Sequence, residues 1–187
     1  MIDFNQINND WSLFLDRDGV INHEIKGKYV NNWSEFVFHD GVAEAFKKFN
    51  GLFKRIIIVT NQRGVSKGLT QLPDLQTIHI NMQEILTING GRIDAIYFCI
   101  EPDDSSACRK PNTGMALQAI KQFPDIDFKK AIMVGDKITD MEFGRNLGMQ
   151  TVFISSSKTK VIAADQHIDE IFDSLISFAK ALPADKL

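Results

Sequence analysis

Two carboxylates one residue apart, Asp16 and Asp18, follow an apolar run over residues 11–15. Short, continuous apolar runs are typical of buried parallel strands, and open α/β folds place their chemistry at the carboxyl ends of such strands. Because two negative charges this close repel, a proton or a cation must neutralise them, and a hard cation such as Mg²⁺ prefers oxygen ligands. A solvated turn is the alternative, since Asp and the following Gly19 both favour turns.

Polar side chains that suit the same chemistry also follow three later predicted strands. These strands, at 56–59, 93–100 and 131–135, lead respectively to Thr60 and Asn61, to Arg109 and Lys110, and to Asp136 with Asp140. The carboxyl ends of parallel strands lie at one edge of a sheet, so these side chains should converge there. Acids that hold a divalent metal, with a hydroxyl and a lysine for phosphoryl oxygens, indicate phosphoryl transfer.

Each of these residues has an ordinary explanation when it is taken alone. Thr60 and Asn61 favour the caps of helices. Lys110 would usually be a solvated surface residue, and an acid at Asp140 would suit the positive end of a helix dipole. Their joint occurrence, in this order on successive strands, favours a functional site over a set of unrelated turns and caps.

Strands and helices alternate along the whole chain. We expect helices at 41–49, 73–88, 111–122 and 139–147, a further strand at 151–154, and a short edge strand with a final helix within 165–182. A small hairpin or flap is expected at 22–38, and loops at 62–68 and after 154. This order predicts an α/β fold, a doubly wound and mostly parallel sheet with helices on both faces. We expect a single domain over 1–187, with no large cap domain.

The composition is that of an ordinary globular protein and excludes several classes. With 187 residues and a formal net charge of −3, the chain gives no reason to expect nucleic acid or an anionic membrane as a partner. It has no apolar run near the roughly 20 residues that span a bilayer, and its first residues do not resemble a signal peptide. The two cysteines, Cys99 and Cys108, do not indicate a disulfide framework. We expect a cytoplasmic monomer.

The polar groups at the strand ends resemble the motifs of the haloacid dehalogenase superfamily of phosphotransferases. The segment 16–20 is similar to the first motif, Asp-x-Asp-Gly-[Thr/Val], and 135–140 is similar to the fourth, Gly-Asp-x-x-x-Asp. Thr60 and Lys110 stand where the second and third motifs have their Thr and Lys. The segments around these motifs resemble the branch that holds D-glycero-D-manno-heptose 1,7-bisphosphate 7-phosphatases and histidinol-phosphate phosphatases. The loop ending at Lys67 is closer to the heptose enzymes.

The resemblance implies a two-step hydrolysis through an aspartyl-phosphate. Asp16 would attack phosphorus, and Asp18 would protonate the leaving oxygen and later take a proton from water. Mg²⁺ would be held by the carboxylates of Asp16 and Asp136 and by the backbone carbonyl of Asp18. Thr60 and Lys110 would bind the remaining phosphoryl oxygens.

Further residues receive supporting or substrate-binding roles from the same resemblance. It implies substrate contacts for Asn61, Arg63, Lys67 and Arg109, and a supporting role behind the site for Asp140 and Lys137. The heptose enzymes usually have a small residue where Arg63 stands, so this position implies either a stronger anion site or a different substrate. Arg63 and Lys67 as solvated loop charges are the alternative.

The chain also departs from its relatives at a zinc-binding loop. Relatives carry Cys-x-His and then Cys-x-Cys, whereas the matching segments here read Cys99-Ile100-Glu101 and Ser106-Ala107-Cys108. A structural zinc site normally uses four thiolate or imidazole ligands. With two of them left, we expect that the zinc site has been lost.

The resemblance implies a Mg²⁺-dependent phosphomonoester hydrolase. The expected substrate is the 7-phosphate of D-glycero-D-manno-heptose 1,7-bisphosphate, within nucleotide-heptose synthesis for lipopolysaccharide. Histidinol phosphate or another small sugar phosphate is the alternative. A polynucleotide 3′-phosphatase would want a basic stripe, which an acidic chain does not suggest. A receiver-like signalling domain would have its phosphorylated Asp on a middle strand, away from a second acid, and an inactive binding module would not need every motif residue.

Overall fold

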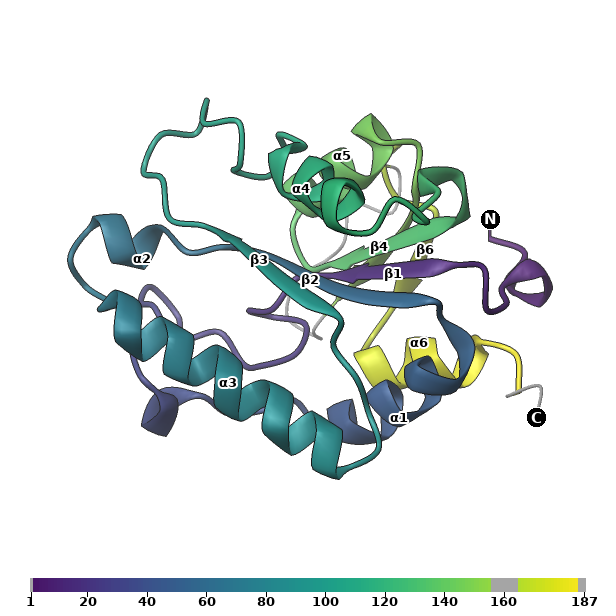
Figure 1. Ribbon diagram of the computed structural model, residues 1–187, viewed down its shortest axis with the longest axis horizontal. Coiled ribbons are helices and arrows are strands. Elements are labelled where there is room, and N and C mark those ends of the chain that lie inside the picture. Colours follow the sequence, from purple (N-terminus) through teal and green to yellow (C-terminus); the bar gives the residue numbers. More distant parts are fainter. Residues whose placement is uncertain (1, 156–164, 185–187) are drawn as a thin grey trace.

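A six-stranded sheet forms the centre of the computed structural model, which describes residues 2–155 and 165–184 (Figure 1). Its strands are β1 (Ser12–Leu15), β2 (Arg55–Asn61), β3 (Ala95–Cys99), β4 (Ala131–Gly135), β5 (Gln150–Ile154) and β6 (Glu170–Phe172). Their spatial order is β3-β2-β1-β4-β5-β6, and every pairing is parallel. The expected α/β class with a doubly wound sheet is confirmed.

Helices cover both faces of this sheet, as expected. In Figure 1, α4 (Gly114–Gln122) and α5 (Ile138–Asn146) lie above it, and α1 (Val42–Leu52), α3 (Leu72–Ile88) and α6 (Leu175–Ala181) lie below. The short α2 (Arg63–Ser66) follows β2, and 3₁₀ turns form at Phe4–Gln6, Trp33–Glu35 and Phe128–Lys130. None of the helices in the described part of the chain is long and apolar enough to cross a membrane.

The central strands are apolar on both sides because both of their faces are covered. Leu13 and Leu15 of β1 pack into the core beneath the sheet, while Phe14 packs into the core above it, and all three are fully buried. Burying a side chain of this size contributes about 1.5–3 kcal/mol. Helices on both faces thus explain why β1 and β2 are continuous apolar runs instead of alternating ones.

The centre of the sheet contains a topological switch point. β1 pairs with β2 on one side and with β4 on the other, and the chain adds strands outward in both directions from this pair. The backbone N–H of Asp16 extends the β1–β4 ladder by donating to the carbonyl of Val134 at 2.9 Å. Ligands of open α/β folds bind in the crevice outside the strand ends at such a point.

The structure corrects one loop prediction and selects between the two alternatives given for another. Residues 62–68, expected as a loop, include the single helical turn of α2 (Arg63–Ser66), and Gly68, where φ is 68°, follows its C-cap Lys67. The segment 22–38 is a flap and not a hairpin, since an isolated bridge between Asn22 and Phe38 and the turn at Trp33–Glu35 are its regular features. Most of the loop expected after residue 154 lies outside the described residues.

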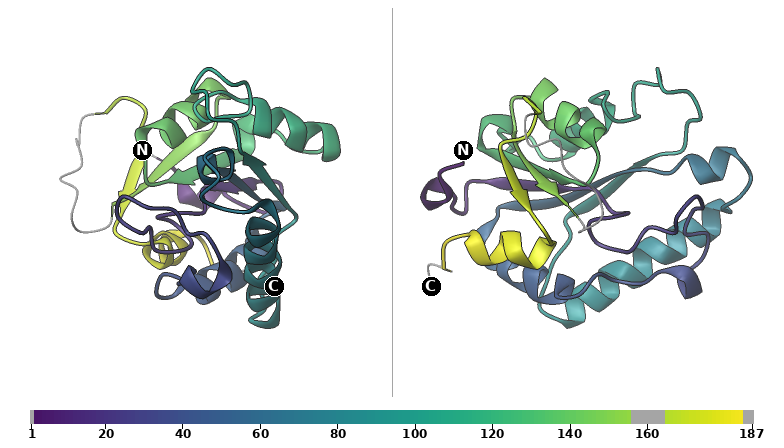
Figure 2. Two further views of the ribbon diagram at one scale, coloured as in Figure 1. Left: turned by 90° about the vertical axis from the view of Figure 1, so that its left-hand side faces the viewer. Right: turned by 180° about the vertical axis from the view of Figure 1, so that it is seen from behind.

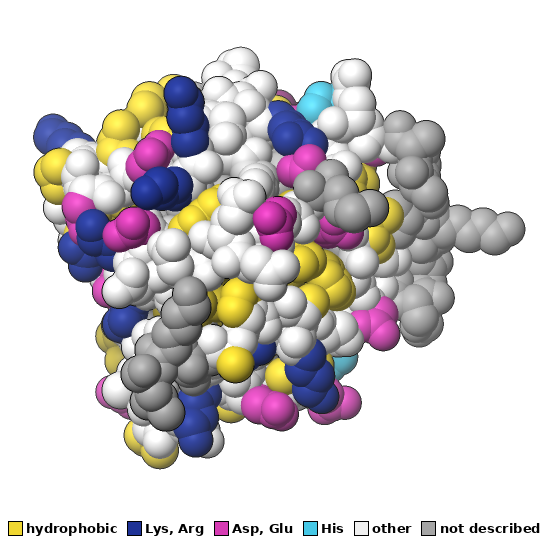
Figure 3. Space-filling model, turned by 90° about the vertical axis from the view of Figure 1, so that its right-hand side faces the viewer, with side chains coloured by type: hydrophobic (Ala, Val, Ile, Leu, Met, Phe, Trp, Pro, Cys, Tyr) yellow, Lys and Arg dark blue, Asp and Glu magenta, His cyan; other side chains and the backbone are white. Residues whose placement is uncertain are grey.

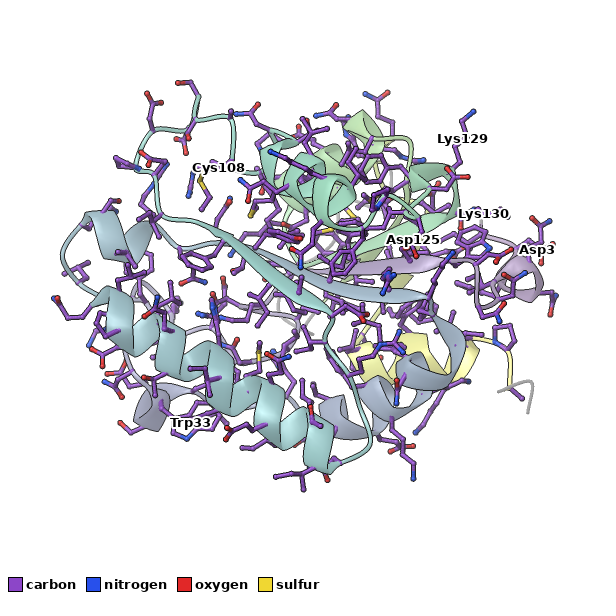
Figure 4. All side chains as sticks on the ribbon, in the orientation of Figure 1. Asp3, Trp33, Cys108, Asp125, Lys129 and Lys130 are labelled. Carbon is purple, nitrogen blue, oxygen red and sulfur yellow. A yellow bond between two sulfur atoms is a disulfide. The ribbon has the colours of Figure 1, made fainter. Side chains whose placement is uncertain are left out.

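The two cysteines form a disulfide, which the sequence did not indicate. Cys99 ends β3, and the loop after it turns back so that Cys108 lies beside it, with a Cα–Cα distance of 5.5 Å. Figure 4 shows Cys108 in this loop, at the opposite end of the molecule from Asp125 and Lys130. The expectation from cysteine number was therefore wrong, because two thiols need only one favourable turn of the chain to meet.

Candidate active site

The predicted catalytic residues meet at the carboxyl edge of the sheet, which faces the viewer in the left panel of Figure 2. Asp16 follows β1, Thr60 lies near the end of β2, and Asp136 follows β4. Lys110 reaches them from the segment between β3 and α4, and Asp140 from the first turn of α5. A pocket opens here, and Asp16, Asp18, Asn61, Lys110 and Asp140 contribute to its wall.

Lys110 is the buried hub of the site. Its ammonium group donates to Asp16 Oδ1 at 2.8 Å and to the carbonyl of Val59 at 2.7 Å, and it lies 2.7 Å from Asp140 Oδ1. These three acceptors match the three donors of an ammonium group. Burial alone would lower the pKa of Lys110, but Asp140 and Asp16 raise it above its ordinary value. The lysine is therefore a fixed positive charge beside Asp16.

The backbone of Lys110 is held as firmly as its side chain. Its N–H donates to Asn61 Oδ1 at 3.0 Å, and the Asn61 side-chain amide donates back to the Lys110 carbonyl at 3.2 Å. Asn61 also lines the pocket. The residue expected to contact substrate thus also joins the end of β2 to the segment that carries the lysine.

Three carboxylates could hold a divalent cation. Oxygens of Asp16, Asp136 and Asp140 all lie within 4.8 Å of one another, and no other such cluster occurs in the residues that the structure describes. Asp140 is already engaged, because Oδ1 pairs with Lys110 and Oδ2 accepts from the N–H of Lys137. Asp136 Oδ1, in contrast, is buried without a partner. Hard oxygen donors of this kind fit Mg²⁺, with Asp16 and Asp136 as the available ligands.

Two glycines of the motifs leave room for these carboxylates. A Cβ atom on Gly19 would lie 2.1 Å from Asp136 Oδ2, and one on Gly135 would lie 2.2 Å from Asp140 Cβ. Gly19 also has a φ of 88°, which side chains rarely adopt. Both positions are therefore restricted to glycine by the acids that they face.

Asp16 and Asp136 resist ionisation in the absence of a cation. Burial raises the pKa of Asp16 to about 6, although Lys110 opposes the shift. Burial, together with the charge of Asp16, raises the pKa of Asp136 to about 8. Burial would lower the pKa of Lys137, but Asp136, Asp16 and Glu24 raise it instead. The site is thus electrostatically incomplete until positive charge enters it.

We expect the affinity for Mg²⁺ to rise by about tenfold or more between pH 6 and pH 8. The acid form of Asp136 predominates below its raised pKa of about 8, and bound Mg²⁺ must displace that proton. Above pH 8 the carboxylates are ionised and the competition ends. Calorimetric titration at both pH values, in buffers of different ionisation enthalpy, measures the affinity and the protons released. An affinity independent of pH would contradict the expectation, and Asp136→Asn should remove most of the pH dependence, leaving the smaller part that comes from Asp16.

Asp18 lies in a different environment from the other acids. Arg17 Nη2 donates to both of its oxygens at 2.9 Å, Asn22 Nδ2 donates to Oδ1 at 2.9 Å, and Gln62 Nε2 donates to Oδ2 at 2.8 Å. Burial would raise the pKa of Asp18, but Arg17 and these hydrogen bonds hold it below its usual value. The carboxylate of Asp18 is thus kept apart from the cluster, although it is two residues from Asp16.

The sequence did not reveal this support of Asp18. Arg17 is 1% exposed, and its Nη1 lies 3.2 Å from His79 Nε2 on α3. A guanidinium only donates, so His79 accepts through Nε2 and is neutral, and burial with the charge of Arg17 lowers its pKa to about 3. Gln62 Nε2 also donates to Thr60 Oγ1 at 2.9 Å. No sequence signal marks an arginine between two acids as buried.

The remaining predicted residues lie around the pocket in two groups. Lys137 lines the pocket and pairs with Glu24 of the flap, and Lys67 lies over the ring of Tyr29, 5.6 Å from its centroid. Arg63 and Arg109 do not line the pocket but pair with Asp104. The flap residues Glu24, Ile25, Lys28, Tyr29 and Val30 line the pocket and were not predicted individually.

Comparison with known proteins agrees with this geometry. A family model described as HAD-hydrolase-like matches residues 107–178. A Mycobacterium bovis protein named D-glycero-alpha-D-manno-heptose-1,7-bisphosphate 7-phosphatase is 38% identical over 175 residues, covering 92% of this chain and 91% of that protein. A Helicobacter pylori protein named for the beta anomer is 39% identical over 142 residues, covering 75% of this chain and 80% of that protein.

Solved structures show the same relationship. The D,D-heptose 1,7-bisphosphate phosphatase of B. bronchiseptica, solved with magnesium and phosphate, has a TM-score of 0.81 and 28% identity, covering 91% of this chain and 96% of that one. The Burkholderia thailandensis protein of the same name has a TM-score of 0.65 and 27% identity over the same shares. These matches, together with the motifs and the geometry of the site, show that the chain belongs to the D-glycero-D-manno-heptose-1,7-bisphosphate 7-phosphatase family of the haloacid dehalogenase superfamily.

Proposed function

We propose that the chain hydrolyses the 7-phosphate of D-glycero-D-manno-heptose 1,7-bisphosphate, in the synthesis of nucleotide-activated heptose. The observation that carries this proposal is the buried set of Asp16, Lys110 and Asp140 beside the unpartnered oxygen of Asp136. It combines a nucleophile, a fixed positive charge and an incomplete cation site at the switch point of the sheet. Relatives named for this activity cover most of the chain and support the choice of substrate.

Mg²⁺ is the cofactor that the donor set fits. Asp16 and Asp136 would hold it through carboxylate oxygens and Asp18 through its backbone carbonyl, with Asp140 orienting Lys110 from behind. When bound, the ion supplies positive charge that offsets the repulsion between the carboxylate of Asp16 and the phosphoryl oxygens. The structure of the B. bronchiseptica protein is named as a complex with magnesium and phosphate, which supports this choice.

In the first step, a carboxylate oxygen of Asp16 attacks phosphorus and the bond from phosphorus to the sugar oxygen breaks. The hydroxyl of Thr60 binds a phosphoryl oxygen, and the fixed positive charge of Lys110 stabilises the charge of the phosphoryl group during the transfer. The sugar oxygen takes a proton from Asp18. Since Arg17 keeps Asp18 ionised in the free protein, that proton must arrive with a monoanionic phosphate ester or from solvent.

In the second step, water attacks the phosphorus of the aspartyl-phosphate. Asp18 takes a proton from this water, the bond between phosphorus and the Asp16 oxygen breaks, and inorganic phosphate leaves. The hydrogen bonds from Arg17, Asn22 and Gln62 hold the carboxylate of Asp18 ready as a base. General acid–base help of this kind typically contributes about 10²–10⁴-fold.

We propose that the enzyme acts in the cytoplasm as a monomeric domain over 1–187 without zinc, on a small phosphorylated sugar. A doubly phosphorylated sugar does not cross membranes, so its phosphatase belongs where the sugar is made. We do not expect nucleic acid as a partner. Figure 3 shows the face of the molecule at the amino ends of the sheet, and charges of both signs are interspersed on it. The disulfide uses both thiols that a zinc site would have needed.

A side-by-side measurement of kcat/KM tests the substrate. We expect kcat/KM for heptose 1,7-bisphosphate to exceed that for histidinol phosphate by about 10²-fold or more, since a site built for a second charged group rejects an analogue that lacks it. Both anomers of the bisphosphate are included, because relatives are named for each. A preference for histidinol phosphate would contradict the proposal.

A further inference from the structure

Arg63 and Arg109 converge on one carboxylate oxygen outside the catalytic cluster. Arg109 Nε donates to Asp104 Oδ1 at 2.9 Å, and Arg63 Nη2 pairs with the same oxygen. The side chain of Asp104 is 82% exposed, whereas those of Arg63 and Arg109 are 24% and 14% exposed. Two largely covered cations thus share one exposed anion.

This arrangement leaves hydrogen-bond donors unused. Arg63 Nε and Arg109 Nη1 are both buried and have no partner. Buried donors are normally satisfied, and each one that is not costs free energy. One carboxylate therefore neither balances the charge of the two guanidinium groups nor saturates their donors. A group with more negative charge and more acceptor oxygens would do both.

The two arginines lie close in sequence to residues that line the catalytic pocket, although they do not line it themselves. Arg63 begins α2, two residues after Asn61, and Arg109 immediately precedes Lys110. Asn61 and Lys110 line the pocket and are joined by reciprocal hydrogen bonds of 3.0 and 3.2 Å. These hydrogen bonds between Asn61 and Lys110 therefore hold the two arginine-bearing segments together, next to residues that line the pocket.

The loop that carries Asp104 is fixed in the same place. The disulfide between Cys99 and Cys108 closes it, and Asn112 Nδ2 donates to the carbonyls of Asp104 and Ser106 at 3.3 and 2.9 Å. Asp104 is thus presented to the arginines by a closed loop.

We propose that Asp104 determines specificity by acting as an internal counter-ion that the second phosphate of the substrate displaces. This inference rests on the proposed function, since it assumes a substrate with two phosphates. A phosphate group has three acceptor oxygens and up to two negative charges, so it satisfies both guanidinium groups better than one carboxylate. A monophosphate has no group to replace Asp104 and leaves the arginines paired as they are.

The test compares Asp104→Asn with a matched control, Asp103→Asn. We measure KM for heptose 1,7-bisphosphate and for heptose 7-phosphate and divide the first value by the second. In Asp104→Asn this ratio should fall about threefold to fivefold, because a weak exposed ion pair no longer competes with the second phosphate. Asp103 is the adjacent acid, and the charge of Arg63 also acts on it, but its side chain accepts from the N–H of Ser105 and forms no ion pair with an arginine, so the ratio should fall clearly less in its variant.

Three results would overturn the inference: an unchanged ratio in Asp104→Asn, a higher one, or an equal fall in Asp103→Asn. A higher ratio would mean that Asp104 orients the arginines for the substrate instead of competing with it. If the wild type hydrolyses p-nitrophenyl phosphate but neither heptose phosphate, the proposed function fails by itself. The ratio is then taken from the inhibition constants of glucose 1,6-bisphosphate and glucose 6-phosphate against p-nitrophenyl phosphate.

Discussion

Asp16→Asn should lower kcat by on the order of 10⁴-fold or more while the protein stays folded. The amide keeps the shape of the side chain but is not a nucleophile, and it contributes no negative charge to a bound cation. Asp16 is the one acid of the cluster that both contacts Lys110 and follows the central strand β1. The measurement is Mg²⁺-dependent phosphate release from the bisphosphate. The rate of the variant is compared with that of the wild type at saturating Mg²⁺.

The stability of this variant separates chemistry from folding. Because burial raises the pKa of Asp16 to about 6, the folded protein binds a proton there more readily than the unfolded chain does. The charge of Asp16 therefore lowers stability as the pH rises from about 4 through 6, and removing it should not unfold the metal-free protein. Asp40→Asn, at an exposed acid, serves as the control and should keep full activity. Turnover above about 1% of wild type in Asp16→Asn would exclude Asp16 as the nucleophile.

The strands and the convergence of the acids were predictable because their causes are local. A fully buried parallel strand must be apolar on both faces, so β1, β2 and β4 appear in the sequence as unbroken apolar runs. The polar residue that follows such a run must then lie at the carboxyl edge. This reasoning placed Asp16, Thr60 and Asp136 together without any knowledge of their contacts.

The support of Asp18 was not predictable, because it depends on residues far apart in the chain. His79, on α3, meets Arg17 across 62 positions of sequence, and Gln62 reaches Asp18 across 44. A charged residue such as Arg17 is usually solvated, and only the packed structure shows that it is buried. The pattern of residues by itself did not distinguish the two acids, and their different roles came from the family resemblance, whereas the structure shows surroundings that give them opposite pKa shifts.

The substrate side of the site was hidden for a similar reason. Arg63 and Arg109 were expected to face substrate, but what they contact depends on the loop that the disulfide closes. No periodicity governs such a loop, and its position follows from side-chain contacts instead. Asp104 therefore had no signal of its own in the sequence.

Lys110→Met should destabilise the metal-free protein by about 3–5 kcal/mol and lower kcat by about 10²–10³-fold. The substitution fills the space but leaves Asp16 and Asp140, whose side chains are 7% and 2% exposed, without their shared cation. Urea unfolding with chelator at pH 8 measures the loss of stability. At pH 5 the loss should be smaller, because Asp16 is then largely protonated in the folded protein.

The double variant Lys110→Met/Asp140→Asn distinguishes the structural from the catalytic role of the lysine. Removing the charge of Asp140 relieves one of the two buried acids, so it should recover about 1–3 kcal/mol of the lost stability. It should recover no activity, because the cation that stabilises the transferring phosphoryl group is still missing. If activity returned together with stability, Lys110 would act only by holding the fold, and the phosphoryl oxygens would have to be bound by Thr60 and the metal alone.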